Sequence, residues 1–124
     1  MNEYRILVVD DEEDLCEILK FNLENEGYEV DTANSAEEAL KMDISAYNLL
    51  LLDVMMGEIS GFKMASMLKK EKKTAKIPII FITAKDTEND TVTGFNIGAD
   101  DYISKPFSLR EVAARVKAVL RRTR

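Results

Sequence analysis

The 124-residue sequence has the length of one domain and is long enough to bury a core. Its composition, 46% hydrophobic and 32% charged, is ordinary for a globular protein. Acidic residues outnumber basic ones by 23 to 17, for a formal net charge of −6. Because nucleic-acid backbones are bound by clustered Lys and Arg, this balance argues against direct nucleic-acid contact and favours a basic partner surface or a bound cation.

The chain contains no His and one cysteine, Cys16. A reaction that needs an imidazole must therefore obtain it from another molecule, and zinc sites built from His or several thiolates are excluded. A single cysteine cannot form an intrachain disulfide, which suits a reducing cytosol. The first residues do not resemble a signal peptide, and no apolar stretch approaches the roughly 20 residues of a membrane span. We therefore expect a soluble, cytoplasmic protein without a membrane segment.

Five short β-like segments alternate with segments of helical periodicity. The expected strands cover residues 4–9, 28–32, 49–52, 77–82 and 102–103. Three of them are almost purely aliphatic, which is typical of strands buried on both faces of a parallel sheet. The second alternates polar and apolar residues and the fifth is very short, so both are expected at the sheet edges.

The helical segments carry recognisable start and stop signals. The acidic residues from Glu12 open the first helix, and Gly27 closes it. Ser35 and Glu38 resemble a capping box for the second helix, and Ser108 is the expected N-cap of the last. The third and fourth helices are expected at about 59–71 and 88–96. The buried stripe of the last helix is expected to comprise Leu109, Val112, Ala113, Val116, Val119 and Leu120.

A fivefold βα alternation predicts a doubly wound α/β fold. We assign residues 1–120 to this one domain, because no linker or low-complexity segment interrupts them. Residues 121–124 are polar and basic, and they fit either a helix end or the start of a linker to an effector domain.

Residues able to carry chemistry follow the expected strands. In such folds, ligands bind beyond the carboxyl ends of the strands, near the point where the strand order reverses. The residues at these ends are Asp10 and Asp11 after the first strand, Asp53 after the third, Thr83 at the end of the fourth and Lys105 after the fifth. Three carboxylates, one hydroxyl and one ammonium should therefore lie on a single rim.

This donor set suits a hard divalent cation. Neighbouring carboxylates repel one another unless a cation joins them, and oxygen-only ligands fit octahedral Mg²⁺ completed by waters and a backbone carbonyl. Such an ion can bind one phosphoryl oxygen, while Thr83 and Lys105 bind the other two. Asp53 would then be a nucleophile that forms an acyl phosphate.

Four segments together resemble a known family, over essentially the whole chain. They are Ile6–Glu12, Leu51–Met56, Phe81–Lys85 and Lys105–Phe107. In this order they resemble the receiver domain of bacterial two-component response regulators. The resemblance implies a flavodoxin-like (βα)5 fold: a doubly wound, five-stranded parallel sheet with strand order 2-1-3-4-5.

The resemblance also implies a chemistry. Asp53 would be phosphorylated from the histidine of a sensor kinase in a Mg²⁺-dependent reaction. The metal ligands implied are Asp10, Asp11, Asp53 and the backbone carbonyl of Met55, with Asp10 acting more often through water. Such a protein phosphorylates and dephosphorylates itself and does not turn over an external substrate, so it is not an enzyme in the usual sense.

Family members switch conformation when phosphorylated. The phosphoryl-binding and switch residues implied here are Thr83, Ala84, Lys105 and Tyr102. The Thr83 hydroxyl would move inward and Tyr102 would turn into the vacated space, which remodels the face of the fourth helix, fifth strand and fifth helix. The Lys105–Pro106 peptide bond is commonly cis in the family.

Residues 98–103 and 111–116 further resemble the OmpR/PhoB-like subfamily, which carries a winged-helix DNA-binding domain. Its receivers form phosphorylation-dependent homodimers through the same face, and this predicts control of transcription through an effector domain outside this sequence. The dimer-face residues implied are Asp100, Asp101, Glu111, Arg115 and Arg122. We expect Arg115 and Arg122 to meet Asp100 or Asp101 of a second copy.

Three positions depart from the family pattern. Gly57 replaces a common proline, Asn48 a frequent aspartate, and Thr91 a basic residue that often contributes to the dimer. None of them alters the expected phosphorylation chemistry.

Other functions fit less well. A phosphorylation-independent docking module of the same fold is the main alternative, although the complete acceptor set argues against it. A haloacid-dehalogenase-like phosphatase would carry an acid at Met55, and a nucleotide-binding domain would have a Gly-rich turn after the first strand.

Overall fold

A computed structural model describes residues 4–84 and 88–122. Its centre is a five-stranded, all-parallel sheet with strand order β2-β1-β3-β4-β5, which confirms the predicted topology. The strands are β1 (Arg5–Val9), β2 (Glu29–Ala33), β3 (Leu49–Leu52), β4 (Ile79–Thr83) and β5 (Asp101–Ser104). The chain moves outward from β1 to β2 and then returns to β3, so the strand order reverses between β1 and β3.

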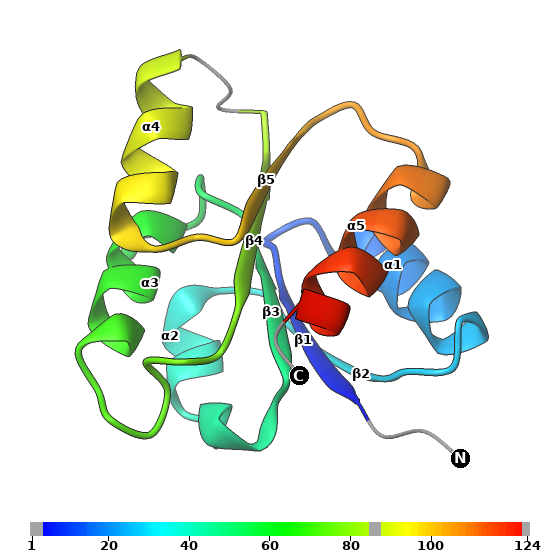
Figure 1. The fold of residues 1–124 in the computed structure, drawn as a ribbon, viewed down its shortest axis with the longest axis horizontal. Coiled ribbons are helices and arrows are strands. Elements are labelled where there is room, and N and C mark those ends of the chain that lie inside the picture. Colours follow the sequence, from blue (N-terminus) through cyan, green and yellow to red (C-terminus); the bar gives the residue numbers. More distant parts are fainter. Residues whose placement is uncertain (1–3, 85–87, 123–124) are drawn as a thin grey trace.

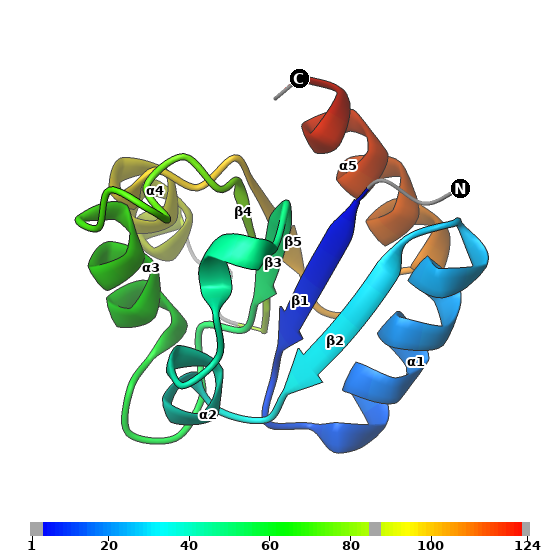
Figure 2. The ribbon, with the colours of Figure 1, turned by 90° about the horizontal axis from the view of Figure 1, so that it is seen from below.

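Helices cover both faces of the sheet. They are α1 (Glu13–Asn25), α2 (Ala36–Leu40), α3 (Gly61–Lys69), α4 (Glu88–Ile97) and α5 (Leu109–Arg122), with a short 3-10 helix, η1 (Ile44–Ala46), before β3. Figures 1 and 2 show α1 and α5 on one face and α2, α3 and α4 on the other. Within the described part of the chain, none of these helices combines the length and apolar character that crossing a bilayer requires.

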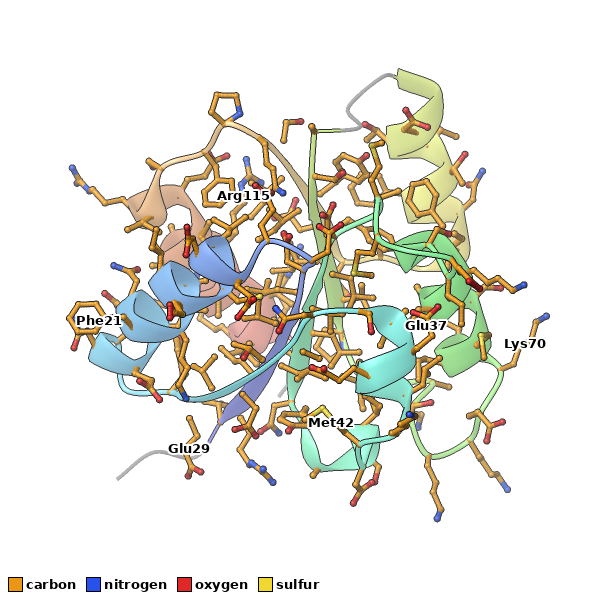
Figure 3. The ribbon with its side chains drawn as sticks, turned by 180° about the vertical axis from the view of Figure 1, so that it is seen from behind. Phe21, Glu29, Glu37, Met42, Lys70 and Arg115 are labelled. Atoms are coloured by element: carbon orange, nitrogen blue, oxygen red, sulfur yellow. The ribbon has the colours of Figure 1, made fainter. Side chains whose placement is uncertain are left out.

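Side chains of alternate strand residues pack into two hydrophobic cores, one on each face of the sheet. In β1, Ile6 and Val8 pack with α1 and α5, whereas Leu7 and Val9 pack with α2 and α3. All four residues of β3 are buried, as the aliphatic sequence predicted for a strand covered on both faces. In contrast, Phe21 on α1 points away from both cores and is 69% exposed (Figure 3).

The third helix is shorter than expected, because a side chain caps its N-terminus and fixes the residue at which it begins. Helix α3 begins at Gly61 and ends at Lys69, inside the expected range of 59–71, because the Ser60 hydroxyl accepts a hydrogen bond from the Lys63 N–H at 3.1 Å. Ser35 and Ser108 cap α2 and α5 in the same way, as predicted.

Two expectations at the ends of elements need correction. The Glu38 side chain accepts from the N–H of Asn34 and not from that of Ser35, so the capping box is displaced by one residue. In the predicted stripe of α5, Leu109 and Ala113 are only partly buried, while the other four residues form the core contact. Arg121 and Arg122 belong to α5, which favours the helix-end interpretation for them, whereas residues 123 and 124 lie outside the described range.

A close backbone approach requires glycine at the start of α3. A Cβ atom on Gly61 would lie 2.1 Å from the backbone carbonyl oxygen of Asp53, far inside contact distance. The Gly61 N–H also donates to the Val54 carbonyl oxygen at 2.9 Å. The loop that follows Asp53 is therefore held directly against the N-terminus of α3.

We predict that Gly61→Ala destabilises the protein, although Ala is favoured over Gly inside helices by up to about 1 kcal/mol. The methyl group would overlap the Asp53 carbonyl, and relieving that overlap should cost about 1–3 kcal/mol in the free energy of urea unfolding. Gly94→Ala is the matched control, because its Cβ would meet only ring carbons of Phe81 and Tyr102, at 3.1 and 3.2 Å. Those rings can shift, so the loss should be smaller. A Gly61→Ala protein at least as stable as the wild type would contradict the prediction.

Candidate metal-binding and phosphoacceptor site

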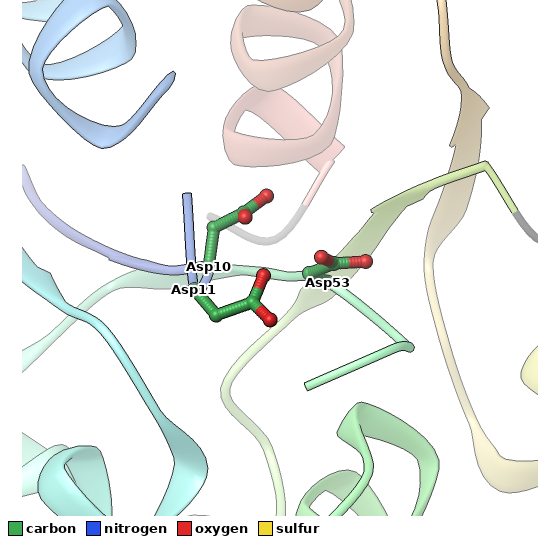
Figure 4. Close-up of side chains that lie close together, drawn as sticks. All are labelled: Asp10, Asp11 and Asp53. Carbon is green, nitrogen blue, oxygen red and sulfur yellow. The ribbon is translucent and has the colours of Figure 1, made fainter. Parts of the chain in front are cut away.

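Three carboxylates meet at the carboxyl ends of β1 and β3. One oxygen from each of Asp10, Asp11 and Asp53 lies within 4.8 Å of the other two (Figure 4). The backbone places them, since the Asp53 N–H donates to the Val9 carbonyl at 2.9 Å and extends the β1–β3 ladder. Asp10 and Asp53 are only 2% and 4% exposed, whereas Asp11 is open to solvent.

Lys105 supplies the positive charge of this cluster. It follows β5, where its N–H donates to the Thr83 carbonyl and the next peptide bond, to Pro106, is cis. Its Nζ lies 2.7 Å from a Glu12 oxygen, 3.2 Å from Asp10 Oδ2 and 3.6 Å from Asp53 Oδ2. Burial lowers the pKa of Lys105, but the Glu12 hydrogen bond and the charges of Asp10 and Asp53 outweigh it, so the net shift is upward and the side chain remains charged.

One ammonium does not neutralise the buried carboxylates. Burial, together with the charge of Asp53, raises the pKa of Asp10 from 3.8 to about 6, despite the hydrogen bond from the Glu12 N–H and the charge of Lys105. Burial also raises the pKa of Asp53, while Lys105, the Met55 N–H and the Thr83 hydroxyl act in the opposite direction. The cluster therefore has a deficit of positive charge that a divalent cation would remove.

The residues expected to contact a phosphoryl group surround Asp53. Thr83 ends β4 fully buried, and its hydroxyl hydrogen-bonds to the Asp53 carboxylate. Ala84 follows it at the surface. Met55 lies in the loop after Asp53, and its N–H donates to Asp53 Oδ1 at 3.2 Å. The structure thus brings the predicted Thr83, Ala84 and Lys105 to the same rim as the acidic cluster.

Tyr102 lies on β5 opposite Phe81, two residues before the end of β4. It pairs with Phe81 in the β4–β5 register, and its half-buried ring meets the Phe81 ring edge-on, with centroids 6.1 Å apart. Gly94 of α4 leaves room for both rings. The importance of Gly94 was not predicted from the sequence, because only the three-dimensional packing shows which rings a Cβ would meet.

Sequence reasoning also missed the residues that hold Asp10 in place. The Asp10 carbonyl accepts hydrogen bonds from Cys16 Sγ and from Asn34 Nδ2, both at 3.3 Å. Burial raises the pKa of the Cys16 thiol to about 11, so it remains a neutral donor. Glu12 was interpreted only as a helix-opening acid, yet its N–H binds Asp10 Oδ1 and its carboxylate binds Lys105. No local sequence signal distinguishes these roles from ordinary packing and capping.

The residues expected at a dimer face contact one another within a single chain. Arg115 Nη1 binds both carboxylate oxygens of Asp101, at 3.1 and 3.0 Å, and its Nε binds Glu111 at 3.2 Å. Arg122 donates to the backbone carbonyl of Asp100, whose own carboxylate accepts the Ile79 N–H. The structure pairs these residues within one chain, whereas the sequence analysis expects their contacts with a second copy.

Comparison with known proteins identifies the fold and its family. Residues 6–117 match the family model described as the response regulator receiver domain. The chain is 50% identical over 120 residues to the alkaline phosphatase synthesis transcriptional regulatory protein PhoP of Bacillus subtilis, covering 96% of this chain and 49% of PhoP. It is 48% identical to the transcriptional regulatory protein SrrA of Staphylococcus aureus, covering 95% of this chain and 48% of SrrA.

Solved structures give the same result. The receiver domain of the Francisella response regulator 1452 superposes with a TM-score of 0.90 at 29% identity, covering 98% of this chain and 100% of that one. The chain spans about half the length of its curated relatives PhoP and SrrA. It belongs to the response regulator receiver domain family, and these two relatives are of the OmpR/PhoB-like type that the sequence predicted.

Proposed function

We propose that this chain is a phosphorylation switch in which Asp53 accepts a phosphoryl group from the phosphohistidine of a sensor kinase. One observation carries the proposal: the buried Asp53 carboxylate stands between the Thr83 hydroxyl and the Lys105 ammonium, beside two further carboxylates. Because these 124 residues contain no His, the imidazole of the donor must lie outside them. A sensor kinase that carries the phosphohistidine is therefore the proposed partner.

The donor set fits Mg²⁺. Asp11 and Asp53 would hold the ion directly, Asp10 through water, and the Met55 carbonyl would complete the protein ligands. When bound, Mg²⁺ would neutralise charge on a phosphoryl oxygen and on the carboxylates. The geometry supports this assignment, because three carboxylates lie within reach of one ion and burial of Asp10 and Asp53 raises the pKa of both, which a bound cation would oppose.

The residues of the chain itself would carry the transfer. A carboxylate oxygen of Asp53 forms the new O–P bond as the N–P bond of phosphohistidine breaks, and the imidazole leaves with the bonding electrons. Lys105 and Thr83 then bind phosphoryl oxygens and stabilise their charge. For this, the Lys105 ammonium must exchange part of its present contact with Glu12 and Asp10 for the new dianion.

The same contacts would drive the switch. Thr83 is bonded to the free Asp53 carboxylate, and an aspartyl phosphate would draw its hydroxyl toward a phosphoryl oxygen. Tyr102 packs against Phe81, which lies two residues before Thr83 on β4, and its movement would favour a second arrangement of the face formed by α4, β5 and α5. On that face Arg115 and Arg122 would exchange intrachain partners for Asp100 or Asp101 of a second copy, with Glu111 adjacent, giving a phosphorylation-dependent homodimer.

The relatives suggest the output of this switch. PhoP and SrrA are named as transcriptional regulatory proteins and are about twice as long as this chain. We infer that the receiver, residues 1–120, controls transcription through an effector region in a longer protein, and does not itself contact nucleic acid. The rival function, a docking module that is never phosphorylated, would leave the arrangement of Asp53, Thr83 and Lys105 without a role.

We predict that incubation with acetyl phosphate and Mg²⁺ adds the mass of one phosphoryl group to the intact chain. The addition should disappear in Asp53→Asn, because the amide is not a nucleophile, and in excess EDTA. Asp43→Asn, which alters an exposed aspartate far from the rim, is the matched control and should react like the wild type. Failure with both acetyl phosphate and a phosphohistidine donor would favour the docking module.

We predict that, without divalent metal, the stability of the protein falls as the pH rises from about 4 to about 6. In this window the raised pKa of Asp10, about 6, makes the folded state bind more protons than the unfolded state, whose pKa stays near 3.8. Asp10→Asn should therefore be more stable than the wild type near pH 7.5, by on the order of 3 kcal/mol, because the pKa shift of Asp10 already includes its ion pair with Lys105.

Chemical unfolding in EDTA across this pH range measures the effect. The advantage of Asp10→Asn should shrink towards pH 4, where Asp10 of the folded wild type is protonated. Mg²⁺ should stabilise the wild type more than the variant near neutral pH. A stability difference between the two proteins that does not change with pH would disprove the assignment of the charge deficit to Asp10.

A further inference from the structure

Glu12 holds the ammonium group of Lys105 more closely than either buried aspartate does. Lys105 Nζ lies 2.7 Å from Glu12 Oε1, 3.2 Å from Asp10 Oδ2 and 3.6 Å from Asp53 Oδ2. It donates hydrogen bonds to Glu12 and Asp10, whereas the separation from Asp53 is too long for one. The ammonium group therefore lies beside the start of α1, just out of reach of the proposed acceptor carboxylate.

The backbone of Glu12 is fixed, whereas its carboxylate stands in solvent. The Glu12 N–H donates to Asp10 Oδ1 at 2.9 Å, and its carbonyl oxygen accepts from the Cys16 N–H at 3.1 Å. Glu12 is the N-cap residue of α1, yet within the described part of the chain its side chain makes no capping hydrogen bond. The side chain is 61% exposed. An exposed carboxylate returns to water at little cost, so its contact with Lys105 can be broken and made again.

The three carboxylates around Lys105 are therefore unequal partners. The side chains of Asp10 and Asp53 are only 3% and 5% exposed, against 61% for Glu12. Burial lowers the pKa of Lys105, and the hydrogen bond to Glu12 is the largest of the effects that raise it. The strongest partner of the ammonium group is thus also the one that can most easily leave it.

We propose that Glu12 is a positioning residue that restrains Lys105 and thereby slows the phosphorylation of Asp53. This inference rests on the proposed function of Asp53. A phosphoryl group that arrives at Asp53 needs the Lys105 ammonium on one of its oxygens. While Glu12 holds that ammonium, the cation is in place for only part of the time. Glu12 therefore competes with the incoming group for one cation, without touching the group itself.

The direct contact can be distinguished from two simpler roles of an acid at this position. A residue that only stabilises the start of α1 would change the stability of the fold and not the position of Lys105. A residue that only repels an anionic donor would act through its charge, whatever the length of its side chain. Glu12→Asp keeps the charge but shortens the side chain by one methylene, and Asp is a preferred N-cap whose carboxylate turns towards the helix N–H groups. Only the direct contact predicts that Glu12→Asp behaves like Glu12→Gln.

The test measures the rate at which the 124-residue chain gains a phosphoryl group from acetyl phosphate, followed by intact mass at saturating Mg²⁺. Glu12→Gln and Glu12→Asp should both react roughly two- to fivefold faster than the wild type, the range expected when an exposed ion pair is lost. Glu13→Gln is the matched control, because it removes the same charge from the next exposed residue, in the first turn of α1. It should react like the wild type.

A second measurement reports the contact without any reaction. In the metal-free chain labelled with ¹⁵N at lysine, the NMR signal of the Lys105 ammonium should shift in both Glu12 variants and stay in place in Glu13→Gln. Raising the ionic strength should reduce the rate advantage of Glu12→Gln, because salt screens an exposed ion pair. A lost helix cap would lower the unfolding midpoint and produce neither effect.

Four outcomes would overturn the inference alone. They are equal phosphorylation rates in the wild type and Glu12→Gln, a Glu12→Asp protein as slow as the wild type, a Glu13→Gln protein as fast as Glu12→Gln, and an unchanged Lys105 signal in Glu12→Gln. A wild type that gains no phosphoryl group from acetyl phosphate or from a phosphohistidine donor would instead overturn the proposed function, and the role of Glu12 with it.

Discussion

Burial of two neighbouring carboxylates at the strand-order switch point is the constraint on which the rest of the structure depends. Asp10 and Asp53 are almost fully buried, and their pKa values are raised because burial disfavours their charged forms. Carboxyl groups with such shifted pKa values are found most often at functional sites. The backbone leaves little freedom here, because the β1–β3 ladder ends at the Val9–Leu52 pair and Asp10 and Asp53 follow directly after it on adjacent strands.

Hydrogen bonds and close packing hold the backbone of Asp10 and Asp53 in place. The Asp10 carbonyl is bonded by Cys16 and Asn34, and the Asp53 carbonyl lies where Gly61 alone leaves room. Lys105 is suited to change partners, because its ammonium is shared among three carboxylates. This division between a fixed acidic frame and an adaptable cation suits a site that must accept a doubly charged group and later release it.

Most of the fold could be predicted from the sequence, because periodicity and strand-end residues are local signals. The aliphatic run of β3 and the serine caps of α2 and α5 are examples. The position of the candidate site was predictable for the same reason, since its acids, hydroxyl and lysine all stand at strand ends. What could not be predicted depends on contacts between distant residues: Glu12 with Lys105, Asn34 with Asp10, and the Cβ-free approach of Gly61 to Asp53. The exact start of α3 was also missed, because the Ser60 cap is decided by one hydrogen bond.

The intrachain ion pairs on the α4–β5–α5 face would oppose the proposed dimer until the chain is phosphorylated. Arg115 is bound by Asp101 and Glu111 in its own chain, so a second copy must compete with partners that are already in place. Exposed ion pairs contribute at most about 1 kcal/mol each, so exchanging an intrachain pair for an equivalent interchain pair gains almost nothing by itself. A dimer on this face therefore needs an additional free-energy term. The proposed movement of Thr83 and Tyr102 could supply it by changing the packing behind β5, and this would make association conditional on phosphorylation.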